Sequence, residues 1–108
     1  MQTVVQVICT SGPSLRTLIG DQGKKLGTHS LEVVAEKADR NPGWMKIKDT
    51  SPGSHGALNV SWDGDTMTLT GRVVTRGAGK PNQIIAAFVS FLLRYHGKRV
   101  KLISIFEV

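Results

Sequence analysis

A glycine-rich loop with two basic side chains is the part of this sequence whose residue types and spacing could best support chemistry. It covers residues 75–82, between a predicted strand and the predicted start of a long helix. Glycines allow the backbone to approach a ligand closely, and the free amide groups at a helix N-terminus attract anions. The loop therefore predicts an anion site formed by Arg76, Gly77, Gly79 and Lys80.

The same loop does not have the pattern of a nucleotide-hydrolysing phosphate loop. That motif has a different glycine spacing and a Ser or Thr directly after its Lys, whereas Pro81 follows Lys80 and removes one amide donor. An ordinary connector, in which Gly and Pro end one element and begin the next, would have the same composition. Both interpretations stay open at this point.

Positive charge is concentrated towards the C-terminus. The formal net charge is +6, and residues 1–65 hold seven basic and seven acidic side chains, while the remainder holds seven basic side chains and one acidic one. Such asymmetry favours an anionic partner such as nucleic acid, although solvated charges that keep a small domain soluble would look the same. The side chains predicted to bind the polyanion are Arg72, Arg76, Lys80, Lys98, Arg99 and Lys101.

Aromatic residues add one candidate to this basic set. Trp44 lies beside Lys46 and Lys48, and we expect it to be exposed and available for stacking on a base. The three phenylalanines are expected to be buried. Because the sequence contains no recognisable nucleic-acid-binding motif, we expect contacts mainly to phosphates and no sequence-specific recognition.

The remaining reactive side chains do not indicate catalysis. His29, His55 and His96 lack metal-ligand spacing, and we expect them in solvated loops or turns. Cys9 ends an apolar run, so we expect a buried, inert thiol; a single cysteine also excludes an intramolecular disulfide and favours a reducing compartment. We therefore expect no metal, no cofactor, and a binding function in preference to an enzymatic one.

The pattern of apolar residues predicts a single α+β domain over residues 1–108. Residues 31–38 fit either a helix or a strand, and the turn sequence that follows at 41–43 favours the strand. The expected fold is a mainly antiparallel or mixed sheet of about five to six strands, with a long C-terminal helix and a short N-terminal helix on one face. The predicted strands are 4–10, 31–38, 45–48, 57–62, 66–76 (after a turn at 63–65) and 102–106, and the predicted helices start at 13–14 and 81.

The last predicted strand is apolar on both of its alternating faces. Such a strand is central in a sheet or pairs across a subunit interface, and we expect a homodimer formed through Ile103 and Ile105. The alternative is that the N-terminal helix covers the second face. The apolar stretch 84–93 is too short to span a bilayer, and the N-terminus does not resemble a secretory signal, so we expect a cytoplasmic protein with no membrane partner.

Three functional hypotheses follow from these features. The leading one is a non-enzymatic domain that binds nucleic acid or another polyanion. The second is a self-associating interaction domain with no role in nucleic-acid binding. The third is a small enzyme or a protein that binds a small anion in the glycine-rich loop.

Overall fold

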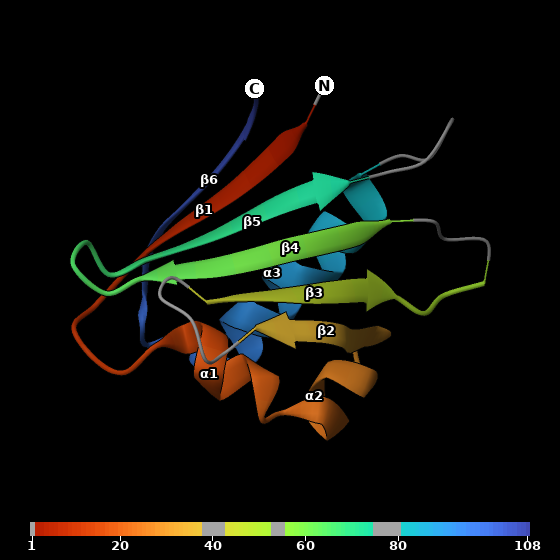
Figure 1. Cartoon of the computed structure of the whole chain (residues 1–108), viewed down its shortest axis with the longest axis horizontal. Helices are drawn as coiled ribbons and strands as arrows, with labels where there is room; N and C mark the ends of the chain where they lie inside the picture. The colour runs from red at the N-terminus through yellow and green to blue at the C-terminus, as the bar shows by residue number, and fades with distance from the viewer. Residues whose placement is uncertain (1, 38–42, 53–55, 75–80) are drawn as a thin grey trace.

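Six antiparallel strands form one sheet, and three helices accompany it, in the part of the chain that the structure describes. This computed structural model describes residues 2–37, 43–52, 56–74 and 81–108. The sheet order is β2-β3-β4-β5-β1-β6, so the predicted α+β class is confirmed (Figure 1). The elements are β1 (Thr3–Cys9), α1 (Leu15–Gly20), α2 (Gly23–Gly27), β2 (Leu31–Lys37), β3 (Trp44–Asp49), β4 (Ala57–Asp63), β5 (Thr68–Val74), α3 (Asn82–His96) and β6 (Val100–Glu107).

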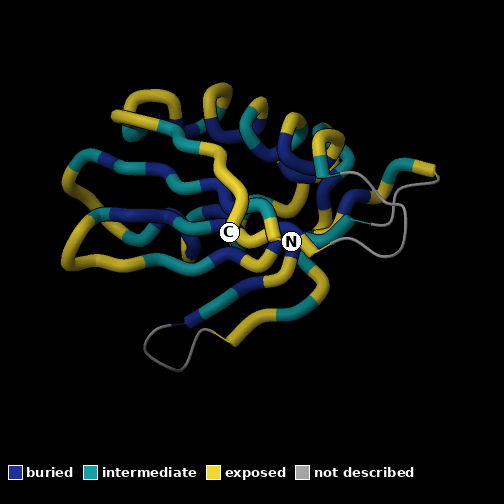
Figure 2. Tube along the Cα trace, turned by 90° about the horizontal axis from the view of Figure 1, so that it is seen from above, coloured by how far each residue is buried: buried dark blue, intermediate teal, exposed yellow. Residues whose placement is uncertain are grey.

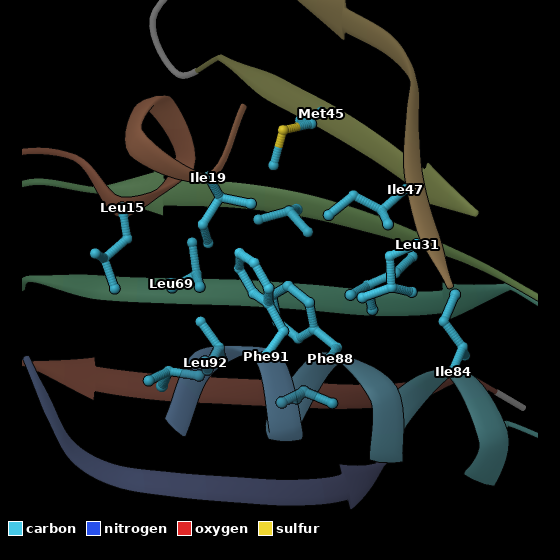
Figure 3. Packing of buried hydrophobic residues seen from close by; sticks show 14 of the residues in the cluster. Leu15, Ile19, Leu31, Met45, Ile47, Leu69, Ile84, Phe88, Phe91 and Leu92 are labelled. Atoms are coloured by element: carbon cyan, nitrogen blue, oxygen red, sulfur yellow. The ribbon is translucent and has the colours of Figure 1, made fainter. Parts of the chain in front are cut away.

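The helices pack on one face of this sheet. Leu15 and Ile19 of α1 lie in the same buried cluster as Phe88 and Phe91 of α3, between the helices and the strands (Figure 3). Figure 1 shows α3 behind the sheet, and the tube of Figure 2 shows it running along one side of the strands. The second face therefore has no helix over it among the described residues. The alternative in which the N-terminal helix covers that face is wrong.

The N-terminal helix is interrupted. Ser14 caps α1 by accepting a hydrogen bond from the amide of Thr17 at 3.3 Å. The helix ends at Gly20 and α2 begins at Gly23, since two glycines so close together weaken a continuous helix. The ambiguous segment 31–38 forms strand β2, which pairs with β3 as predicted. Most of the turn between them falls in residues 38–42, outside the described residues.

The β4–β5 hairpin is present, but its loop is longer than the tight turn predicted at 63–65. The strands pair up to Asp63 and Thr68, and residues 64–67 form the loop. Asp63 Oδ1 accepts the amides of Asp65 and Thr66 at 2.9 and 3.4 Å, and Met67 adopts a φ of 54°. Met67 thus belongs to the loop and not to the strand, although its side chain still packs against the core.

The terminal strand β6 occupies an edge of the sheet. It pairs with β1 and with no other strand of the described chain, so the prediction of a central position is wrong. Phe106, which we expected to be buried, is 43% exposed because no helix of the described segments covers its face. Phe88 and Phe91 are fully buried, as predicted. None of the described helices is both long and apolar enough to cross a membrane.

Candidate functional site

The face of the sheet opposite α3, which we call the open face, carries the best candidate site. Residues directly opposite one another on antiparallel strands share a face. Lys46 on β3 lies opposite Asn59 on β4, and Asn59 lies opposite Arg72 on β5. All three side chains are exposed, while their neighbours Met45 and Val60 point into the core. One row across three strands thus presents a cation, an amide and a second cation.

Further basic groups surround this row. Lys48 lies two residues from Lys46 on the same strand and on the same face, and it is exposed. Lys46 and Arg72 are two strands apart, which corresponds to about 10 Å between their backbones. Arg72 Nη1 donates to the side-chain oxygen of Gln2 at 3.2 Å, which orients the guanidinium along the surface. Three cations therefore lie close together at the centre of the open face.

Carboxylates neutralise this cluster only in part. On the described part of the open face, the register places Glu32 opposite Lys48 and Asp63 at the far end of β4. The Asp63 carboxylate is occupied with the amides of its own loop. Lys37 on β2 adds a fourth cation to the same face. The described part of the open face thus carries four basic and two acidic side chains, so its net charge is positive.

Trp44 supplies the aromatic component of this face. It begins β3, opposite Lys37 on β2 and Ser61 on β4, and it is half-buried. The alternation along β3 puts its indole on the same face as Lys46 and opposite to buried Met45. Trp44 therefore shares a face with Lys46 and Lys48, but it is half-buried and not fully exposed as expected, and its stacking role stays a prediction.

The other basic residues predicted from the sequence do not join this cluster. Lys98 and Arg99 lie in the turn between α3 and β6, and Lys101 lies at the start of β6, near the Cys9 end of β1. Arg72 lies near the other end of β1, opposite Val4, which is roughly 14–17 Å away along the strand. Arg76, Gly77, Gly79 and Lys80 lie outside the described residues.

Arg99 has a structural role in this arrangement. Its guanidinium donates to the backbone carbonyls of Thr10 and Pro13 at 3.1 and 3.0 Å, and it lies 5.9 Å from the Trp62 ring centroid. The fit is close, because a Cβ added to Gly12 would lie 2.7 Å from Arg99 Cζ. Arg99 thus holds the connection between β1 and α1, and its donors are directed at the protein itself.

A second group of cations, around Tyr95, was not predicted from the sequence. Lys25 Nζ lies 5.2 Å and Arg94 Cζ 5.7 Å from the Tyr95 ring centroid. The hydrogen bond with Thr28, and then Arg94, lower the Tyr95 pKa below 10. Lys25 and Tyr95 are distant in sequence, so no local signal could have joined them. This cluster lies on the helical side of the molecule, away from the open face.

The histidines and the cysteine lie away from the open face wherever they are described. His96 is buried, with Nε2 2.7 Å from Gln22 Oε1, and burial, then the Arg99 and Lys25 charges, lower its pKa. The expectation of a solvated His96 is therefore wrong, because the end of α3 packs against the segment before α2. His29 packs edge-on against Phe91 and Tyr95, and His55 lies outside the described residues.

Cys9 is buried, and burial raises the pKa of its thiol, in agreement with the expected inert cysteine. The described residues contain no group of three or more His, Cys, Asp or Glu side chains placed to hold a metal ion. The sequence matches no protein-family model, and neither a curated protein nor a solved structure shows significant similarity to it.

Proposed function

We propose that this protein is a non-enzymatic domain that binds single-stranded nucleic acid through the open face of its sheet. One observation carries the proposal: Lys46, Asn59 and Arg72 form a row across three neighbouring strands, with Lys48 and Trp44 beside it. Basic side chains of this kind bind phosphates, and an aromatic ring on the same surface can stack on a base.

The chemistry of the open face favours a single strand over a duplex. Stacking on Trp44 requires an unpaired base, and the B-DNA major groove admits a helix or a two-stranded ribbon but not a six-stranded sheet. Polar side chains between the cations can hydrogen-bond to exposed base edges. The register places Asn59, Ser61 and Thr70 in this position, with Gln6 on the neighbouring strand β1.

The same geometry supports binding without catalysis. The described histidines and the cysteine, whose side chains could serve as general base or nucleophile, lie on the helical side of the sheet. The lysines and Arg72 of the open face supply positive charge and hydrogen-bond donors. These are the properties that phosphate binding requires.

The proposal is tested by titrating labelled single-stranded oligonucleotides with the protein and following the fluorescence anisotropy of the label, a readout that also serves for variants of Trp44. The double variant Lys46→Glu/Arg72→Glu should weaken binding by about hundredfold or more at low salt, because it replaces two attractive charges with two repulsive ones. For the parent, log K should fall with log salt at a slope of about −2 to −3, corresponding to three or four phosphate contacts. Trp44→Ala should cost about 1–3 kcal/mol of binding.

Lys24→Glu/Lys98→Glu is the matched control, since it makes the same change of charge at two exposed residues away from the open face. It should retain most of the affinity. Equal losses in the two double variants would show that net charge alone drives binding, and equal affinity of Lys46→Glu/Arg72→Glu and the parent would refute the proposal. Arg76 and Lys80, which the sequence also predicts to contact phosphates, are tested separately with Arg76→Glu/Lys80→Glu.

A further inference from the structure

The outer edge of β6 lacks the features that normally protect an edge strand. Leu102, Ile105 and Phe106 are 57%, 53% and 43% exposed, and charged residues occur only near the ends of the strand. The opposite edge, β2, carries Glu32, Glu36 and Lys37 and is interrupted by an irregularity between Val33 and Ala35, whereas the register shift of the β1–β6 ladder lies at the start of β6, between Val100 and Leu102. Charges and bulges prevent unwanted strand pairing, and β6 has few of them along its middle.

An apolar groove continues from this edge to α3. The groove has a volume of about 530 Å³, and its lining includes Ile85, Ala86 and Val89 of α3 and Ile105 of β6. Leu93, which is 54% exposed, follows Ala86 and Val89 at helical spacing and extends the same flank of the helix. The exposed apolar surface therefore includes the strand edge and the adjacent helix flank. Exposed apolar surface of this extent is typical of an interaction site.

We propose that two copies of this chain pair through their β6 edges around a twofold axis, which joins their sheets into one. The backbone of β6 is oriented for this pairing. The Val108 amide donates to the Gln2 carbonyl at 2.9 Å, towards β1. Because peptide groups alternate in direction along an antiparallel strand, the N–H and C=O groups of Ile103, Ile105 and Glu107 point to the free edge.

The positions of the charged and apolar residues along β6 favour one register for the β6–β6 pair. With the twofold axis at Ser104, Lys101 lies opposite the second copy's Glu107. The same register places Leu102 opposite Phe106 and Ile103 opposite Ile105. Moving the axis to Ile103 would place Ile105 opposite Lys101, and moving it to Ile105 would place Ile103 opposite Glu107. The register centred on Ser104 is thus the one that pairs opposite charges with each other and apolar residues with each other.

The β6–β6 dimer also brings the apolar groove of each copy next to the subunit interface. A twofold axis perpendicular to the sheet keeps the helices of both copies on the same side, so the groove of each copy borders the β6 strand of the other. The open faces of the two copies become continuous on the other side. If the proposed function is correct, the dimer presents its nucleic-acid surface twice; the pairing itself does not depend on that function.

The experiment measures the mass of the protein in solution by light scattering and sedimentation, without nucleic acid. The parent should be a dimer, and Ile105→Lys should weaken dimerisation by about hundredfold or more, because it places a charge in an apolar contact. Val34→Lys is the matched control, since Val34 is a 45% exposed apolar residue on the opposite edge strand. It should leave the dimer intact. Circular dichroism verifies that each variant is folded.

The register is tested by exchange of charge. Glu107→Lys should weaken the dimer by about tenfold, because two lysines then face each other, and Lys101→Glu/Glu107→Lys should restore it. A parent that is monomeric at high micromolar concentration would refute the proposal. In that case the β6 edge would be a candidate site for a different protein. A dimer that survives Ile105→Lys, or a double variant that fails to recover, would refute the β6 pairing in this register. Lys46→Glu/Arg72→Glu should remain a dimer, which separates this proposal from the proposed function.

Discussion

Lys98 and Arg99 are neighbours with similar charge, yet the structure places them in different roles. Lys98 is exposed, whereas Arg99 donates to the carbonyls of Thr10 and Pro13. Hydrogen bonds from a charged donor contribute about 1.5–3 kcal/mol. We therefore predict that Arg99→Ala lowers the free energy of unfolding by about this amount, measured by chemical denaturation, while Lys98→Ala changes it little. An equal effect of the two substitutions would contradict the structural role of Arg99.

The buried His96 predicts a dependence of the fold's stability on pH. Burial lowers its pKa in the folded state, so the folded protein binds a proton less readily than an unfolded chain, in which the pKa is about 6.5. Above the unfolded-chain pKa, His96 is neutral in both states and does not reduce the free energy of unfolding. As the pH falls below that value towards the folded-state pKa, the unfolded chain takes up the proton first and the free energy of unfolding decreases.

We predict that the free energy of unfolding decreases on acidification through pH 6.5, with a slope of at most about 1.4 kcal/mol per pH unit from this residue. In His96→Gln this part of the slope should disappear. The comparison is made by chemical denaturation across that range. A variant whose pH dependence parallels the parent's would show that His96 is not responsible.

Helix α3 is the element on which the core depends most. Phe88 and Phe91 project from it into the cluster formed with the helix-facing side chains of the strands, and both are fully buried (Figure 3). We predict that Phe88→Ala lowers the free energy of unfolding by about 3–5 kcal/mol, because it removes a large buried side chain and leaves a cavity. Ser90→Ala, an exposed change on the same helix, should have little effect. A loss below about 1 kcal/mol for Phe88→Ala would contradict this role.

For the molecule as a whole, the one-sided placement of the helices explains both proposals. All three described helices lie on one face, so the core lies on that side, and the opposite face carries polar and basic side chains on its central strands β3, β4 and β5. The same one-sided cover leaves Leu102 and Phe106 of the edge strand exposed. The proposed pairing with a second copy would give this exposed apolar strand the neighbour that the described helices do not provide.

The sequence by itself determined the local elements and the side-chain alternation along each strand. The β4–β5 hairpin, the long helix α3 and the shared face of Trp44, Lys46 and Lys48 follow from the sequence, because periodicity and turn residues act over a few positions. Only the tertiary structure decided that Arg72 lies in the same row as Lys46, that Arg99 is used internally, that His96 is buried and that β6 is an edge. Each of these depends on which distant segments pair, and strand order and register arise from packing of the whole chain, which local spacing does not contain.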